Sequence, residues 1–89
     1  MNVMKLRDAH KQFKDFLHGN KRSNATIVAY GKDIEQLVTF LEELDKNHVH
    51  EVSKEDIESF LAKMTDKGYT PKSVSRKINS TRTFYRFLK

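Results

Sequence analysis

Residues 70–88 read TPKSVSRKINSTRTFYRFL, and this stretch predicts one helix with an apolar side and a basic side. Thr70 is a suitable N-cap and Pro71 suits the first helical position. The apolar side is a stripe at spacings of three and four, formed by Val74, Ile78, Thr81, Tyr85 and Leu88. The other side carries Lys72, Arg76, Asn79, Thr83 and Arg86, and the segment holds no acidic residue. Such a helix is suited to lie against a polyanion, although a solvated basic face is the common alternative.

Charge is distributed along the chain in three blocks. Residues 1–32 hold seven Lys and Arg against two Asp and Glu, whereas residues 33–66 hold three against ten. Residues 67–89 hold seven basic residues and no acidic one, and the net charge of the chain is +5. If the fold brings the two ends together, the molecule gains one positive surface that steers it toward phosphate backbones.

Length and composition restrict the class of protein. The 89 residues suffice for a single domain spanning 1–89, and 37% apolar with 33% charged residues is typical of a globular chain. The chain has no cysteine, which fits a cytoplasmic location, and it has no apolar run long enough for a membrane segment. The sequence stops inside a helical pattern, so we expect the domain to be an excised N-terminal piece of a longer protein.

Hydrophobic periodicity predicts four helices and no strands. The expected ranges are about 5–17, 23–44, 53–67 and 70–88, with a polar loop at 46–52. Ser53 and Asp56 form a capping-box variant, and Gly68 is a stop signal before the last helix. Short connections between amphipathic helices favour an all-α fold, a compact four-helix bundle.

The expected core lies on the apolar stripes of these helices. Its members are Phe13, Leu17, Tyr30, Ile34, Leu37, Leu41, Ile57, Phe60, Leu61, Val74, Ile78 and Tyr85. Gly31 interrupts the second stripe at a cost of about 1 kcal/mol relative to alanine. Close packing of two helices is the favoured explanation for this glycine, and close approach to a ligand backbone is the alternative.

The residues that carry chemistry do not form a recognisable active site. His48 and His50 lie two apart in the loop, but no third metal ligand stands at a suitable spacing. The three glycines are isolated, so no phosphate-binding loop is present, and serines and histidines alone do not make a triad. We therefore expect no catalytic residue, no metal and no cofactor in this chain.

Three blocks of sequence together resemble the N-terminal core-binding domain of tyrosine recombinases, the phage-integrase and Xer-like group. They are NxTxxxYxxDI followed by FL in residues 24–41, DIxxFL in residues 56–61, and KGYTPxSVSRKIxxxRxFYxFL in residues 67–88. The resemblance implies a SAM-like four-helix bundle that forms half of a clamp around DNA. It also implies that catalysis belongs to a second, C-terminal domain, so none of the tyrosines here is the nucleophile.

In this family the second and fourth helices approach the duplex, which selects candidate DNA-binding residues by position. They are Asn24, Thr26, Lys32, Lys72, Ser73, Ser75, Arg76, Lys77 and Arg82. Lys77 and Arg82 lie at the sides of the apolar stripe, so bridging to an acidic residue of the second or third helix is an alternative role for both. Arg76 is the best candidate for a contact at or near the major groove.

The leading hypothesis is a non-catalytic DNA-binding module of a site-specific recombinase or integrase. Its expected partners are double-stranded DNA and, in the full-length protein, other recombinase protomers. The isolated domain is expected to be monomeric and not to associate with a membrane. The alternative is a helical protein–protein interaction module that docks an acidic partner. Phe13 and Phe16 of the first helix are candidates for contact with a neighbouring protomer.

Overall fold

The computed structural model describes residues 4–20 and 22–88, so Lys21 and Lys89 lie outside the described residues. It contains four α-helices, α1 (Leu6–Gly19), α2 (Asn24–Glu43), α3 (Lys54–Asp66) and α4 (Pro71–Leu88), and a short 3₁₀ turn, η1 (Val49–Glu51). Within those residues there is no strand, only an isolated bridge between Lys5 and His48. The prediction of an all-α, four-helix fold is confirmed.

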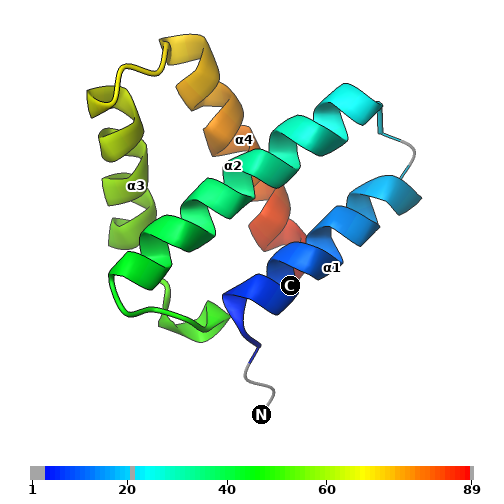
Figure 1. Ribbon diagram of the computed structural model, residues 1–89, viewed down its shortest axis with the longest axis horizontal. Helices are drawn as coiled ribbons and strands as arrows, with labels where there is room; N and C mark the ends of the chain where they lie inside the picture. Colours follow the sequence, from blue (N-terminus) through cyan, green and yellow to red (C-terminus); the bar gives the residue numbers. More distant parts are fainter. Residues whose placement is uncertain (1–3, 21, 89) are drawn as a thin grey trace.

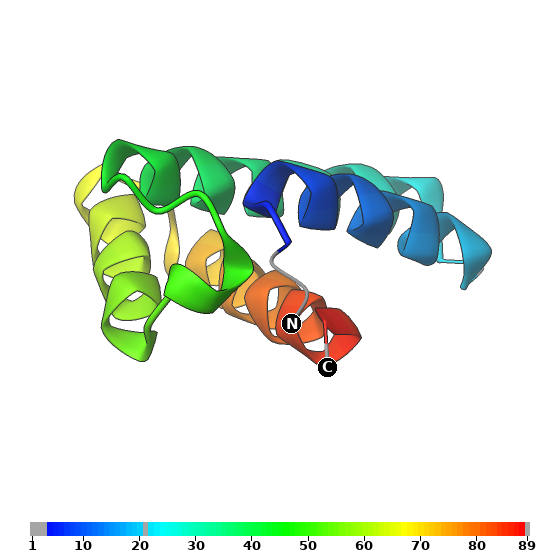
Figure 2. The ribbon, with the colours of Figure 1, turned by 90° about the horizontal axis from the view of Figure 1, so that it is seen from below.

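The helices are arranged around α2, the longest of them at 20 residues. α1 and α2 run side by side in opposite directions, and α3 stands against the far half of α2 (Figure 1). α4 crosses beneath α2, and its last turns lie below α1 (Figure 2). Because α4 contacts all three other helices, its position decides which basic residues reach the surface next to α2.

Local capping signals set the helix ends, as the sequence predicted. The Oγ of Ser23 accepts the Thr26 amide at 3.2 Å at the start of α2. At the start of α3, Ser53 and Asp56 form the reciprocal capping box. Gly68 adopts φ +94° just after α3, a conformation that favours glycine. Each signal satisfies backbone groups that a helix leaves without partners at its ends.

The hydrophobic core lies where α1, α2 and α4 meet, with α3 closing one end. Its buried members are Leu6, Ala9, Phe13, Leu17, Ile27, Ile34, Leu37, Val38, Leu41, Phe60, Met64 and Phe84. The expected core was right for six of its twelve residues. Tyr30, Ile57, Leu61, Val74 and Tyr85 pack against this core while remaining half-buried.

The main correction concerns the rotation of α4. The predicted stripe faces α3 and is only half-buried at Val74, Ile78 and Tyr85. The fully covered side of α4 shares Thr81 with this stripe and otherwise carries Lys77, Ser80 and Phe84. Lys77 and Ser80 occupy this side because a buried carboxylate on α2 supplies them with partners, as described below.

Aromatic rings tie the end of α4 to α1. Phe13 and Phe84 are fully buried, with ring centroids 5.2 Å apart in an edge-to-face arrangement. Phe16 and Phe87 lie beside them at a centroid distance of 4.7 Å. Phe13 is therefore committed to the core and is not available for contact with a neighbouring protomer.

Gly31 lies in the contact between α1 and α2, but the packing there does not require a glycine. Gly31 is buried, and its carbonyl oxygen accepts a hydrogen bond from Nε2 of His10 at 2.9 Å. A Cβ at this position would approach only the side chain of Lys14, with Cδ at 3.4 Å. The neighbour is the flexible stem of a lysine, so there is room for a methyl group.

We therefore expect Gly31→Ala to raise the free energy of unfolding by about 0.5–1 kcal/mol, because alanine loses less backbone freedom in a helix. Urea denaturation measures the change. Gly68→Ala is the matched control, because a left-handed residue there makes alanine unfavourable by about 1–2 kcal/mol. If both variants change stability in the same direction, the assignment of Gly31 is wrong.

Candidate nucleic-acid interface

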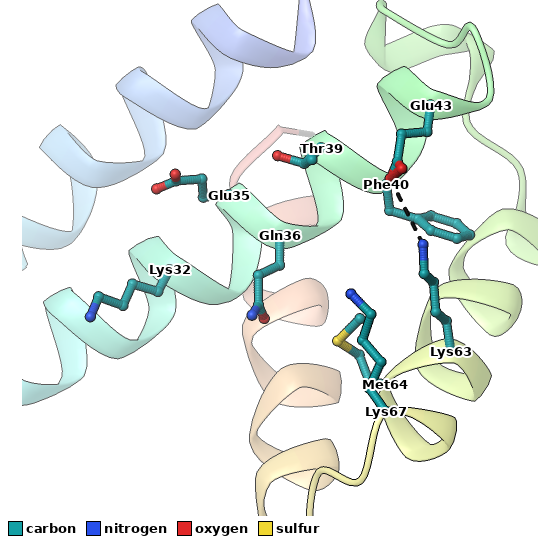
Figure 3. Close-up of a pocket in the computed structure, with 9 residues that line it drawn as sticks. All are labelled: Lys32, Glu35, Gln36, Thr39, Phe40, Glu43, Lys63, Met64 and Lys67. Carbon is teal, nitrogen blue, oxygen red and sulfur yellow. Dashed lines mark ion pairs between the residues drawn. The ribbon is translucent and has the colours of Figure 1, made fainter.

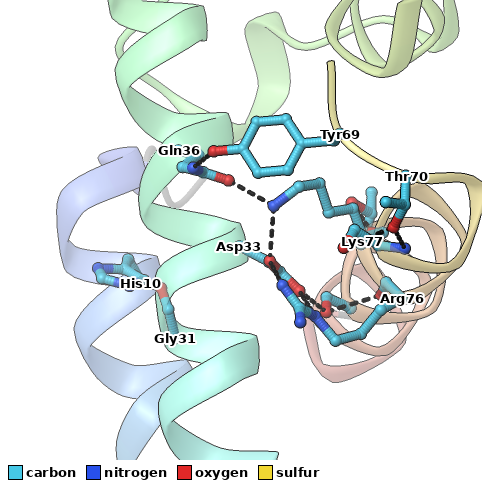
Figure 4. Close-up of polar contacts among 11 residues, drawn as sticks. His10, Gly31, Asp33, Gln36, Tyr69, Thr70, Arg76 and Lys77 are labelled. Atoms are coloured by element: carbon cyan, nitrogen blue, oxygen red, sulfur yellow. Dashed lines mark hydrogen bonds and ion pairs between the residues drawn. The ribbon is translucent and has the colours of Figure 1, made fainter. Parts of the chain in front are cut away.

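A buried carboxylate joins α2 to α4. Asp33 is 1% exposed and lies in the middle of the crossing between the two helices. Its Oδ1 accepts from Arg76 Nη2 and Lys77 Nζ, each at 2.9 Å, and its Oδ2 accepts from Arg76 Nε at 3.0 Å and Ser80 Oγ at 2.7 Å (Figure 4). One carboxylate thus binds three polar side chains of α4, of which Lys77 and Ser80 are buried and Arg76 is partly exposed.

Two opposing effects act on the pKa of Asp33. Burial raises the pKa of this carboxyl group, but hydrogen bonds from Arg76, Ser80 and Lys77 together outweigh burial and hold the pKa below its usual value. Asp33 is therefore ionised at neutral pH, and its charge is matched by two cations. Asp33 is the first residue of the acidic block 33–66, and it is buried in contact with the basic helix α4.

Lys77 lies inside the protein. It is 1% exposed, and its ammonium group binds Asp33 and, at 2.6 Å, Oε1 of Gln36. The ring of Tyr69 covers it, with the ammonium nitrogen 4.5 Å from the ring centroid, and Tyr69 Oη accepts from Gln36 Nε2 at 2.9 Å. Of the two roles considered for Lys77, bridging to an acidic residue of α2 is the one the geometry supports.

Arg76 has a different position in the same network. Its side chain is 44% exposed, and Asp33 engages only the edge formed by Nε and Nη2. The end of the guanidinium, with the N–H groups of Nη1 and the second N–H of Nη2, remains outside this pair. The paired charge and hydrogen bonds hold the pKa of Arg76 above its usual value. Arg76 is thus a fixed cation whose guanidinium end has no hydrogen-bond partner among the described residues.

The free end of Arg76 borders a shallow depression on the outer side of α2. Its lining residues are Asn24, Ala25, Val28, Ala29, Lys32 and Arg76. None of these residues is acidic, and α2 has no acidic residue in its first turn. The first three turns of α2 and the first half of α4 therefore share a surface with two cations at its border, which is the electrostatic pattern of a phosphate-binding face.

The remaining candidate residues divide into exposed and engaged groups. Lys72 and Ser75 are exposed on the first turns of α4. Thr26 and Ser73 are half-buried and take part in the N-terminal caps of α2 and α4, where the Ser73 amide donates to Thr70 Oγ1 at 3.2 Å. Arg82 lines a groove between α3 and α4 rather than the depression beside Arg76. The structure thus brings Asn24, Lys32 and Arg76 together and leaves Arg82 apart from them.

A second hollow, of about 340 Å³, lies between α2 and α3 (Figure 3). Phe40 and Met64 form its apolar part, and Lys63 lies 3.8 Å from the Glu43 carboxylate and 5.3 Å from the centre of the Phe40 ring. Glu35 and Glu43 both line this hollow. Two carboxylates beside the lysines make it a poor surface for a polyanion, in contrast to the acid-free depression beside Arg76.

The groove between α3 and α4 is mainly apolar. Ile57, Leu61, Ile78 and Tyr85 form its apolar part, and its other lining residues are Lys54, Glu58, Thr81 and Arg82. Burial raises the pKa of the Tyr85 hydroxyl to about 12, and in the described part of the chain this hydroxyl has no hydrogen-bond partner. Ile78, Thr81 and Tyr85 of the apolar stripe that the sequence assigned to the core line this groove.

The loop histidines act locally. Nδ1 of His48 lies 3.0 Å from Glu51 Oε1, which also accepts the backbone amide of His48 and so caps η1. His50 stacks near His48 at a centroid distance of 5.7 Å. Among residues 4–20 and 22–88, no group of three or more His, Cys, Asp or Glu side chains is arranged to hold a metal ion. In the same part of the chain, no helix is long and apolar enough to cross a bilayer.

Asp33 and Tyr69 are the site residues that the list of candidates missed. Asp33 lies three residues after Tyr30 and four before Leu37, so it falls within the apolar stripe of α2. A single carboxylate in an apolar stripe is costly unless cations reach it, which was a usable signal for a buried ion pair. Tyr69 offered only its place in a turn, and nothing in the sequence indicated that its ring covers a lysine.

The fold and this surface define a small four-helix domain with a depression on the outer side of α2 that is lined by two cations and no acidic residue. Comparison with known families gives the assignment. Residues 10–89 match the family described as phage integrase, N-terminal SAM-like domain, and the chain belongs to this family.

Sequence relatives agree with this assignment. The chain is 37% identical over 79 residues to tyrosine recombinase XerC of Bacillus subtilis, covering 88% of this chain and 26% of the relative. It is 39% identical over 72 residues to tyrosine recombinase XerC of Chlorobaculum parvum, covering 74% of this chain and 21% of the relative. The chain therefore spans about a quarter of the length of the curated relatives it matches.

The fold also matches a solved structure. The N-terminal domain of a phage integrase/site-specific recombinase from Haloarcula marismortui superposes with a TM-score of 0.90, at 12% sequence identity, over 99% of this chain and 84% of that one. At this identity the likeness bears on the fold, and it confirms the SAM-like four-helix architecture expected from the resemblance.

Proposed function

We propose that this chain is the DNA-binding N-terminal module of a tyrosine recombinase and contacts double-stranded DNA through α2 and α4. The observation that carries the proposal is the acid-free depression between the start of α2 and Arg76. The family supports DNA as the partner, and the catalytic groups would belong to a part of the recombinase outside this chain. Residues 1–89 would then form one domain that binds DNA but does not itself catalyse recombination. Its location would be the cytoplasm.

Phosphate contacts would supply most of the affinity. Lys32 and Lys72 are exposed, carry mobile ammonium groups and lie on the two helices that face the duplex in this proposal. Asn24 and Ser75 add uncharged hydrogen-bonding groups on the same helices. Such contacts set the position of the protein on DNA without reading its sequence. Lys77 is excluded from this set by its burial, and Arg82 is placed outside it.

Arg76 would read a base. Its free end presents two parallel N–H groups, the geometry that matches O6 and N7 of guanine. Asp33 already fixes the other edge of the guanidinium, so little side-chain freedom remains to be lost when the DNA contact forms. We assign Asp33 as the positioning residue for Arg76.

A salt titration of duplex binding tests this function. If about four phosphates are contacted, raising the salt concentration from 50 to 200 mM should weaken binding about 10²-fold, because counterions are released on binding. Lys72→Ala should reduce the slope of log K against log salt by about 1. Lys54→Ala is the control, because Lys54 is an exposed lysine on the α3 side and should leave the slope unchanged. Binding that does not respond to salt would contradict the proposal.

The groove between α3 and α4 favours a second candidate function, docking of an acidic protein partner. Two cations, Lys54 and Arg82, and one carboxylate, Glu58, line the groove beside its apolar residues, and the Tyr85 hydroxyl is without a partner among the described residues. Amide chemical-shift mapping with duplex DNA separates the two functions. Shifts at Asn24, Lys32 and Arg76 support the DNA module, whereas a silent α2 would leave the groove as the principal site.

A further inference from the structure

Val28 is the most exposed large apolar residue of the described chain. It is 56% exposed, whereas the other apolar residues of α2 that point inward, such as Ile27 and Ile34, are at most 8% exposed. Valine is also a weak helix former, because its branched Cβ restricts its rotamers in a helix. Neither packing nor helix propensity therefore accounts for this residue.

Val28 has apolar neighbours, and basic residues lie at the edge of the same depression. Ala25 and Ala29 lie beside it in the same depression, and Lys32 and Arg76 stand at the border. Scattered surface apolar residues are normal and need no explanation, but here three adjacent small apolar residues form a continuous floor. Since the lining contains no acidic residue, the charge complementarity of the depression favours an anionic occupant over an ordinary protein surface.

A DNA major groove offers both parts of the complement. Its phosphates match the cations at the border, and the C5 methyl group of thymine is the apolar feature displayed on its floor. The small side chains of Ala25 and Ala29 allow the backbone of α2 to come close to base edges. Val28, which is larger, would project farther toward the bases than either alanine. A purely electrostatic contact would make no use of an exposed valine between Lys32 and Arg76.

We propose that Val28, supported by Ala25 and Ala29, contacts the methyl group of a thymine in the major groove and so helps to choose the DNA site. This inference rests on the proposed DNA-binding function and adds a determinant of specificity to it. Arg76 would read a guanine beside it, and the two contacts would use adjoining parts of one depression.

The test replaces thymine by deoxyuridine, which removes only the methyl group. A duplex selected by this protein from a random pool is resynthesised with deoxyuridine at one thymine after another, and binding is measured at fixed salt. At one position the wild-type protein should bind the deoxyuridine duplex about fourfold more weakly than the thymine duplex. This factor corresponds to about 0.8 kcal/mol, the free energy of burying one methyl group. Val28→Ala should bind the thymine duplex more weakly by a similar factor and should be indifferent to deoxyuridine at that position.

Leu44→Ala is the matched control, because Leu44 is 45% exposed at the other end of α2 and should keep the full response to deoxyuridine. Equal deoxyuridine responses of the wild type and Val28→Ala would overturn the inference, as would a selected duplex in which no methyl group matters. If either of these results is found while duplex binding still depends on salt, the inference about Val28 is wrong but the proposed DNA-binding function is not contradicted. Absence of any duplex binding would overturn both.

Discussion

Replacing Asp33 by asparagine is expected to lower the free energy of unfolding by about 3–5 kcal/mol. The carboxylate is 1% exposed and neutralises Lys77, which is also 1% exposed and cannot reach solvent without opening the contact between α2 and α4. The variant leaves that ammonium group buried without a counter-charge. Since small domains are stable by only about 5–15 kcal/mol, urea denaturation should show a large shift of the midpoint.

Two further variants assign the effect to the buried charge. Asp15→Asn changes an exposed carboxylate on α1 and should alter stability by less than about 0.5 kcal/mol. Adding Lys77→Met to Asp33→Asn should recover part of the loss, because the second change removes the unpaired ammonium group. If the double variant loses as much stability as the single variants Asp33→Asn and Lys77→Met lose together, the unpaired Lys77 ammonium group is not the cause of the Asp33→Asn effect.

The same carboxylate predicts a dependence on pH. The pKa of Asp33 is held below its ordinary value of 3.8, so the folded state binds this proton less readily than the unfolded state. The stabilisation by Asp33 is therefore complete only well above its ordinary pKa of 3.8 and is lost progressively as pH falls through that value and then through the lowered pKa. The difference in unfolding free energy between wild type and Asp33→Asn should shrink over that acidic range, and a constant difference would contradict the charged state of Asp33.

Phe84→Ala is the second substitution expected to have a large effect, a loss of about 3–5 kcal/mol. Phe84 is fully buried, and its ring contacts that of Phe13 edge-to-face. Its removal leaves a cavity between α1 and α4 that the flanking rings cannot fill without leaving their own contacts. Thermal unfolding followed by circular dichroism measures the loss.

Phe87→Ala is the control for this cavity. Phe87 lies on the next turn of α4 and belongs to the same aromatic group, but it is only half-buried. We expect a clearly smaller loss, because less apolar surface leaves water at this position on folding. Equal losses for the two variants would mean that the end of α4 frays and that the Phe13–Phe84 contact is not specific.

The sequence predicted the helices better than their orientation. Ser23, Ser53 and Gly68 are local signals, and they act the same way in any tertiary context, so the helix ends were right within a few residues. The rotation of α4 depends on a partner from another helix. The apolar pattern put Lys77 at the side of the stripe and did not place Ser80, whereas hydrogen bonds to Asp33 on α2 hold both of them inside.

The candidate site was also predicted in part: its position along the helices followed from the sequence, but the burial of individual side chains did not. Sequence alone placed Asn24, Lys32 and Arg76 on the basic helices, and the structure brings them to one depression. Burial of Lys77 and the separate position of Arg82 could not be read from spacing, because each lies at the side of a stripe where a small rotation decides between solvent and a neighbouring helix. Val28 was counted neither as core nor as site, since an isolated valine carries no sequence signal of its own.

The double engagement of Arg76 has a consequence for how this domain can diversify. If Arg76 reads a base as proposed, a mutation of Arg76 would alter target choice and would also remove one of the two cations paired with Asp33, so a new DNA preference gained there would cost folding stability. Val28 and Asn24 project from the outer side of α2 and are free of such ties to the interior. Lineages that change their DNA site are accordingly expected to vary first at these two positions, and to alter Arg76 only together with Asp33.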